Sequence, residues 1–193
     1  MTLPPPAPQR QLKHRRQMEV QVFVREDGLW EVDATLVDTK TRPIQTVQGP
    51  RPAGEPLHDM LLRLVVDRQL NVVASGAQTR AMPYEGICGE HGDAYGRLVG
   101  LNLGRGFRQG LKERVGGVLG CTHISELAQV LPTAVIQGFA GEVIDTRGDD
   151  GQQPFQIDRC HALRSDGEAV LQFYPRWHRP AHPSLSETAR TAE

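Results

Sequence analysis

The chain is poor in aromatic residues and in cysteine, and it has no long hydrophobic run. Aromatic residues make up 5% of its 193 residues and hydrophobic residues 38%, which favours one modest core with generous polar loops. Its three cysteines, Cys88, Cys121 and Cys160, are odd in number and far apart, which argues against a disulfide framework. We therefore expect a reducing compartment.

An excess of charge of one sign is also lacking. The 22 lysines and arginines nearly balance the 23 aspartates and glutamates, and the net charge of -1 gives no reason to expect binding to nucleic acid or to an anionic membrane. No stretch approaches the roughly 18 apolar residues of a membrane span, and no apolar segment of a signal peptide follows the basic N-terminal residues. These features predict a cytoplasmic protein without nucleic-acid or membrane partners.

Strand patterns fill the first half of the chain. Alternating apolar residues on both sides of the turn "EDG" predict a hairpin over residues 19–37. Residues 58–67 and 70–78 predict a second strand pair, and a loop rich in proline and glycine separates it from the first.

Helical patterns follow from about residue 90. We expect a short helix over residues 93–103, a second over 106–115 and a longest one over 121–140. The longest helix has one apolar stripe, made of Ile124, Leu127, Leu131, Val135 and Phe139. Strands followed by helices predict an α+β fold, an antiparallel sheet of hairpins covered on one face by about three helices.

The two ends of the chain differ in character from its middle. We expect an extended proline-rich and basic arm over residues 1–16, a single domain over 17–178 and a polar tail over 179–193. Near the end of the domain, "SDGE" predicts a tight turn before a strand over residues 169–174.

Cys121 is the first chemical candidate. It stands at the expected start of the longest helix, with Thr122 as the expected N-cap and His123 close by. The unpaired N–H groups and the positive end of the helix dipole favour a thiolate, the form that attacks electrophiles or binds metal. The alternative is a small buried cysteine that only fills space.

Five further residues, two of them cysteines, could join a site. Cys88 lies in the glycine-rich loop "GICGEHG", and such loops let the backbone approach a ligand closely. His58 and Asp59 stand where a loop enters a strand, so their side chains should face opposite ways. Cys160 and His161 form another neighbouring pair in "RCHAL".

A basic stretch accompanies the middle helix. Arg105, Arg108, Lys112 and Arg114 form either a solvated helix face or a docking patch for an acidic protein partner or a phosphate-bearing ligand. The glycines of "GRGFRQG" do not follow a strand, so they do not meet the structural requirement for a nucleotide-binding loop.

Four segments resemble a bacterial family known only as a domain of unknown function. They are "EDGLWEVDATLVDTKT", "AGEPLHDM", "GCTHISEL" and "CHALRSDGEAV". That resemblance implies no activity.

A more distant resemblance covers roughly residues 55–140 and concerns the iron–sulfur cluster assembly scaffolds of the NifU N-terminal type. It is carried by order: "LHDM" before a strand pair, Cys88 after the pair, and Cys121 at the start of the last long helix. The resemblance implies that Asp59, Cys88 and Cys121 take the scaffold's aspartate and its second and third cysteines. Leu57 stands in place of the first cysteine, which puts ordinary cluster assembly in doubt.

Three hypotheses of function follow. The first is a metal-binding protein that holds zinc or iron with Asp59, Cys88, Cys121 and either His58 or His123, and that acts as a hydrolase or lyase on a small molecule if one coordination position stays open. The second is a metal-free enzyme with Cys121 as nucleophile and His123 or His161 as its partner. The third is an accessory protein whose cysteines are structural, with the basic helix face as its docking surface.

Overall fold

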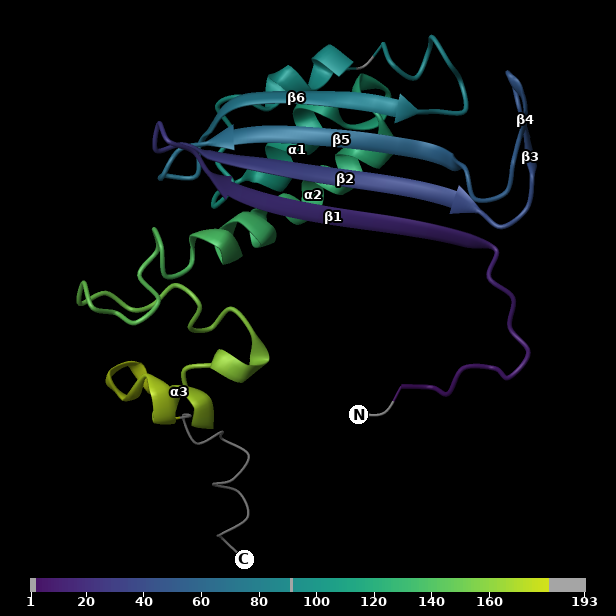
Figure 1. Cartoon of the computed structure of the whole chain (residues 1–193). Helices are drawn as coiled ribbons and strands as arrows, with labels where there is room; N and C mark the ends of the chain where they lie inside the picture. Colours follow the sequence, from purple (N-terminus) through teal and green to yellow (C-terminus); the bar gives the residue numbers. More distant parts are fainter. Residues whose placement is uncertain (1–2, 91, 181–193) are drawn as a thin grey trace, which may run out of the picture. The chain divides into compact units, whose positions relative to one another are not determined.

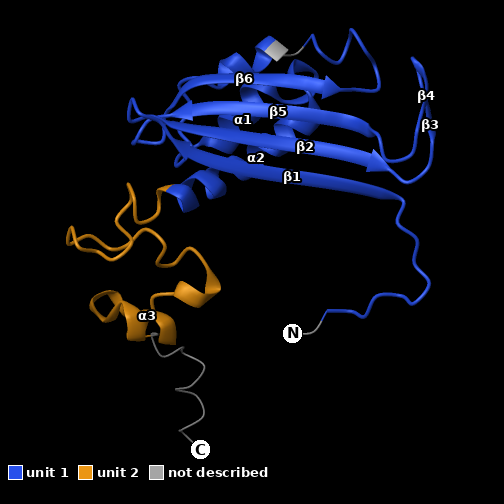
Figure 2. Cartoon of the chain, in the orientation of Figure 1, with its two compact units in different colours: residues 1–138 blue, residues 139–193 orange. Residues whose placement is uncertain are grey.

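The structure is a computed structural model, and it describes residues 3–90 and 92–180 (Figure 1). The described residues fall into two compact units that divide between Gly138 and Phe139. We call them unit 1 and unit 2 and treat them separately (Figure 2). The domain over residues 17–178 that the sequence predicts stays a prediction.

Unit 1 is built on a four-stranded antiparallel sheet. Its strands are β1 (His14–Val24), β2 (Trp30–Lys40), β5 (Pro56–Val66) and β6 (Val72–Ala81), in the spatial order β1-β2-β5-β6. Both predicted hairpins are confirmed. The first turns at Gly28, whose φ of 79° lies in the left-handed region that favours glycine.

A second, smaller sheet follows β2. It is the hairpin of β3 (Ile44–Thr46) and β4 (Gly49–Arg51), and it leads directly into β5. β1 starts at His14, before the predicted hairpin start at residue 19, because polar side chains of its first residues bind to β2, as described below.

Helices cover one face of the main sheet, as Figure 1 shows. They are the 3-10 helices η1 (Gly92–Leu98) and η2 (Gly117–Leu119) and the α-helices α1 (Phe107–Val115) and α2 (Thr122–Phe139). The predicted apolar stripe of α2 is confirmed, because all five of its side chains have an exposed fraction of 0%. The α+β class is likewise confirmed.

The core lies between α2 and alternate residues of the two central strands. Val32, Ala34 and Leu36 of β2 point to the helices, as do Leu62 and Leu64 of β5, and all five are fully buried. Since side chains alternate along a strand, the next helix-facing position of β2 after Leu36 belongs to Asp38, and His58 lies opposite it on β5. The same alternation that builds the core therefore places Asp38 and His58 on the helix-facing side, where the core ends.

Unit 2 contains the 3-10 helices η3 (His161–Leu163) and η4 (Pro175–Trp177) and the short helix α3 (Glu168–Phe173). The strand predicted over residues 169–174 is wrong, because this segment is α3, which starts after Gly167 and buries Val170. A short apolar run of this length does not distinguish strand from helix by its periodicity. Most of the predicted tail, residues 181–193, lies outside the described residues.

Candidate metal centre

The centre of the site is the carboxylate of Asp38, the only buried charged side chain in the described core, with 2% of its surface exposed. Arg16 of β1 donates to both of its oxygens, from Nε to Oδ1 at 2.8 Å and from Nη2 to Oδ2 at 2.7 Å. His14 Nε2 lies 3.0 Å from Oδ1, and His58 Nδ1 lies 3.0 Å from Oδ2. Because an ionised carboxylate only accepts, both histidines donate to it.

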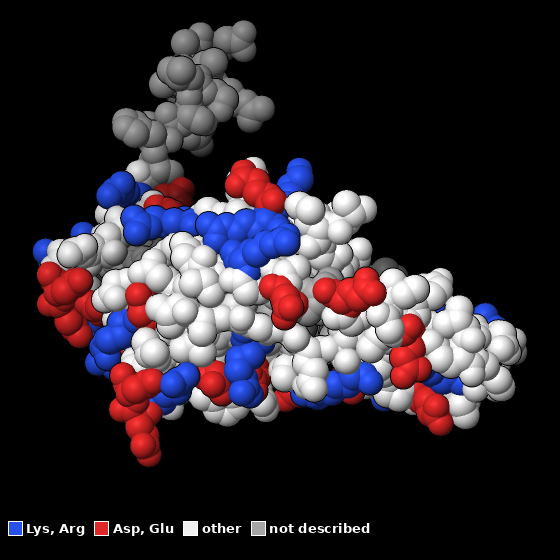
Figure 3. All heavy atoms as spheres, turned by 90° about the horizontal axis from the view of Figure 1, so that it is seen from above, with Lys and Arg blue, Asp and Glu red and all other residues white. Residues whose placement is uncertain are grey.

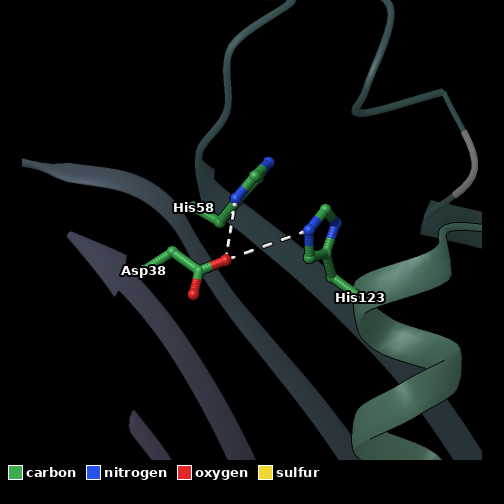
Figure 4. A group of neighbouring side chains, drawn as sticks. All are labelled: Asp38, His58 and His123. Atoms are coloured by element: carbon green, nitrogen blue, oxygen red, sulfur yellow. Dashed lines mark hydrogen bonds and ion pairs between the residues drawn. The ribbon is translucent and has the colours of Figure 1, made fainter. Parts of the chain in front are cut away.

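His123 brings the long helix to the same point. It lies on the first turn of α2, with Nε2 3.9 Å from Asp38 Oδ2. Its ring stacks obliquely on that of His58, with centroids 3.9 Å apart and an interplanar angle of 33°. Figure 4 shows the three side chains converging from β2, β5 and α2, and one potential ligand atom of each lies within 4.8 Å of the other two.

Arg16 also joins the sheet to the helix. Its Nη1 lies 2.5 Å from Glu126 Oε2, one turn beyond His123 on α2. The guanidinium thus pairs with one carboxylate on β2 and another on α2, which fixes the first turn of α2 over the end of the sheet.

The charge state of Asp38 is set by opposing effects. Burial alone would raise its pKa, but the hydrogen bonds and the positive charge of Arg16 outweigh burial, with help from the hydrogen bonds of His58 and His14. The net result is a pKa lowered to about 2, so the group is a carboxylate at neutral pH.

The pKa values of His58 and His123 are both lowered, which favours their neutral forms. Burial is the main cause that lowers the pKa of His58, and the charges of Arg16 and Arg51 lower it further, against the raising effect of Asp38. Burial also lowers the pKa of His123, followed by the charges of His58 and Arg16. Neutral imidazole is the form that binds a metal ion.

The distances suit a small coordination sphere. In a tetrahedral zinc site with bonds of about 2.0–2.1 Å, neighbouring ligand atoms are roughly 3.3 Å apart. The separations of 3.0 and 3.9 Å from Asp38 Oδ2 to His58 Nδ1 and His123 Nε2 bracket that value. Ligation through His58 Nδ1 requires the tautomer with the proton on Nε2, so the metal bond would replace the hydrogen bond from His58 to Asp38. Arg16 and His14 would then be the hydrogen-bonding partners that orient a ligating carboxylate.

Cys121 lies beside this group rather than within it. Its Sγ is 3.8 Å from His123 Nδ1 and 3.9 Å from Met60 Sδ. Its carbonyl accepts from Ser125 N–H, so Cys121 itself caps α2, one residue before the expected cap. Gly120 precedes it because a Cβ there would lie 2.6 Å from the carbonyl oxygen of Val115.

Of the residues singled out by sequence, the structure brings His58 and His123 together, and Cys121 contacts His123. Asp59 follows His58 on β5, and by strand alternation its side chain faces the other side of the sheet, with Oδ1 3.8 Å from Arg80 Nη1. Cys88 lies in a turn, where its N–H donates to the carbonyl of Tyr84. Neither belongs to the close group of ligand atoms found in the described residues. Their role as ligands stays a prediction.

Cys160 and His161 lie in unit 2, where Cys160 is exposed and His161 begins η3. None of the three cysteines forms a disulfide in the described structure, which agrees with the expectation from their number. Any part of the Cys160–His161 pair in a metal site remains a prediction.

Sequence reasoning missed Asp38, Arg16 and His14. A signal for Asp38 was present, since it continues the buried alternation of Trp30, Val32, Ala34 and Leu36 in β2 with a carboxylate. A charged residue in such a position needs partners, and that need points to Arg16.

Surface charge of both signs is mixed over the face in Figure 3, where Lys and Arg lie beside Asp and Glu. Within the predicted basic stretch, Arg114 is held by the molecule itself, because its Nη1 donates to the carbonyls of Arg97 and Val99. Docking of a partner on Arg105, Arg108 and Lys112 stays a prediction. No helix in the described part of the chain is both long and apolar enough to cross a membrane.

Comparison with known proteins gives one result. No curated protein and no solved structure matches the chain. A family model described as "Protein of unknown function (DUF2889)" matches residues 14–137, which is more than half of the chain. That range holds Asp38, His58 and His123 with their partners Arg16 and His14, five residues that we call the Asp38 group. The "CHAL" segment lies beyond the range. The likeness to the NifU-type scaffolds stays a prediction. The chain therefore belongs to the DUF2889 family of proteins of unknown function.

Proposed function

We propose that the protein binds one divalent metal ion through Asp38, His58 and His123. The observation that supports this most is the convergence of a buried carboxylate and two imidazoles from three separate elements, with ligand atoms within 4.8 Å of one another. The lowered pKa values of all three groups favour the forms that bind metal. The ligand set expected from sequence had one histidine, either His58 or His123, together with Asp59, Cys88 and Cys121. The proposed set uses both histidines and takes its carboxylate from Asp38.

The donor set favours zinc or iron(II). Two imidazoles and one carboxylate suit either ion, and three protein ligands leave at least one position open to water or substrate. A metal with an open position polarises a bound oxygen and makes bound water a nucleophile near neutral pH. The chemistry we propose is therefore hydrolysis or a lyase reaction on a small molecule.

Isothermal titration of chelator-treated protein with Zn²⁺ tests the proposal. We expect about one ion per chain, and a loss of affinity of at least a hundredfold in His58→Ala and in His123→Ala, since each removes one of three ligands. Asp59→Ala is the matched control, because it removes the neighbouring carboxylate on the other face of the same strand and should keep the affinity.

Two outcomes would contradict the proposal. One is the absence of stoichiometric binding to a protein whose circular dichroism shows that it is folded. The other is the reverse pattern, in which Asp59→Ala abolishes binding while His58→Ala does not.

A second candidate function is thiol chemistry at Cys121. Its supporting observation is the 3.8 Å contact between Cys121 Sγ and His123 Nδ1 at the N-terminus of α2. The first-turn N–H groups of α2, which have no intrahelical partner, would stabilise the oxyanion formed by attack on a carbonyl. Mass spectrometry after limited iodoacetamide treatment tests it: Cys121 should react well ahead of the exposed Cys160, and equal or slower reaction would reject the candidate.

A further inference from the structure

Arg51 lies beside the site but is not part of the Asp38 group. At the end of β4, its Nη1 donates to the carbonyl of Pro56 at 2.6 Å and to that of Leu57 at 3.4 Å, and its Nη2 donates to Met82 O at 3.3 Å. These contacts hold the guanidinium at the entry of β5, against the peptide that immediately precedes His58.

The charge of Arg51 is not paired with any carboxylate of the described residues. Arg16 pairs with Asp38 and Glu126, and Arg63 pairs with Asp33 and Glu31 on the other face of the sheet. Within residues 3–90 and 92–180, Arg51 forms no ion pair, although its side chain is partly buried. A partly buried cation held only by carbonyl groups is unusual, because charges removed from water are normally paired.

The carbonyl contacts use only part of the donor capacity of Arg51. A guanidinium carries five N–H groups in a rigid fork that matches the oxygens of a carboxylate or phosphate. Because the carbonyl contacts already hold the Arg51 side chain in place, less conformational entropy of that side chain is lost when an anion binds.

The charges of the site point the same way. The formal charges of Arg16, Arg51, Asp38 and Glu126 sum to zero, although only Arg16 is paired with the two carboxylates. A divalent ion at the Asp38 group would therefore leave an excess of two positive charges. An excess of that size in a partly buried site attracts anions and disfavours cationic ligands.

We propose that the site takes a small anionic ligand, one bearing a carboxylate or a phosphate, with one oxygen on the metal ion and another on the Arg51 guanidinium. The metal contact rests on the proposed function, whereas the contact with Arg51 does not. The two oxygens of a single anionic group, or of two groups on one molecule, bridge the two positive centres.

The experiment measures the binding of inorganic phosphate and of malonate by isothermal titration, in Zn²⁺-loaded and in chelator-treated protein. In the loaded protein, Arg51→Gln should weaken binding of at least one of the two probes by roughly tenfold or more, because a charge-assisted hydrogen bond is lost. Its Zn²⁺ affinity should stay within about threefold of that of the parent protein, since no ligand is removed.

Two further variants make the result specific. Arg51→Lys keeps the charge and should retain much of the binding, while Arg63→Gln removes a cation from the other face of the sheet and should change nothing. Thermal unfolding of each variant shows whether the carbonyl contacts of Arg51 are needed for folding.

The outcomes separate this inference from the proposed function. If chelator-treated protein binds the probes through Arg51 but no Zn²⁺ binds, the anion site stands and the metal proposal fails. If Zn²⁺ binds as expected and neither probe binds, or Arg51→Gln binds as tightly as the parent, the inference is overturned and the metal proposal stands.

Discussion

The two halves of the helix-facing side of the sheet are built by one rule and have opposite chemistry. In the middle of β2 and β5, the positions that point to α2 carry Val32, Leu36 and Leu62, which are fully buried. Two residues further along β2, the same side carries Asp38, flanked by Arg16 and His58 in direct cross-strand register. The apolar half stabilises the fold by excluding water, whereas the polar half is ordered by hydrogen bonds and charge.

The comparison shows how the polar half tolerates a buried charge and why its side chains are held in fixed orientations. A buried carboxylate is tolerated only where donors replace its water, and Asp38 has four such donors on its two oxygens. A network that is fully satisfied holds each side chain in one orientation, which is the requirement for a metal or ligand site. The predictions below separate the two halves.

The largest effect on stability is expected in the apolar half. Leu62→Ala should lower the free energy of unfolding by about 3 kcal/mol, since it removes a fully buried side chain and leaves a cavity. Urea unfolding followed by circular dichroism measures it. Zn²⁺ affinity of the folded fraction should not change, and a strong loss of affinity would show that the two halves are not separable.

Asp38→Asn should affect both stability and binding. It should lower the free energy of unfolding by about 2 kcal/mol, since the buried partner of Arg16 loses its charge, and it should abolish stoichiometric Zn²⁺ binding. The same urea series and a Zn²⁺ titration measure the two effects. A variant as stable as the parent would contradict the anchoring role of the Arg16–Asp38 pair.

Acid should destabilise the polar half in two steps. The pKa values of His58 and His123 are lower in the folded state than in the unfolded state. As the pH drops below about 6.5, the unfolded state therefore binds more protons than the folded state, and the free energy of unfolding falls. The pKa of Asp38 is also lowered, so its contribution is complete above about pH 4 and lost as pH falls towards 2.

The Asp38 step should amount to about 1–2 kcal/mol, since Arg16 and His14 reach solvent and screening weakens their effect. Urea unfolding at a series of pH values measures both steps. Asp38→Asn should lack the lower step and keep the upper one, and an unchanged lower step would assign it to other carboxylates.

The smallest effect is expected at Cys121. Cys121→Ser should change the free energy of unfolding by about 1 kcal/mol or less, because the side chain is only partly buried and contacts His123 and Met60 through long sulfur contacts. Thermal unfolding measures it. A loss of several kcal/mol would make Cys121 a core residue and weaken the candidate thiol chemistry.

Sequence patterns predicted the elements better than the site. Period-two and period-3.6 patterns predicted both hairpins and the α2 stripe, because these elements bury one face and the burial is visible as periodicity. The strand predicted over residues 169–174 was wrong, because a segment of six residues is too short for a strand or a helix period to dominate.

The site depends on register, which local patterns do not contain. His58 and His123 could be singled out as reactive types near element ends, but their shared partner could not. Asp38 is opposite His58 only because the β2–β5 pairing places it there, 20 residues away in the chain. The resemblance in motif order drew attention to Asp59, whose side chain lies on the other side of the same strand.

The most direct test of the central claim is the absorption spectrum of the Co²⁺-loaded protein. We predict ligand-field bands that saturate at about one Co²⁺ per chain, without a thiolate-to-cobalt charge-transfer band, and unchanged in Cys121→Ser. A folded protein without ligand-field bands would contradict the account. So would a strong charge-transfer band that disappears in Cys121→Ser, because the ion would then be held by a cysteine and not by the Asp38 group alone.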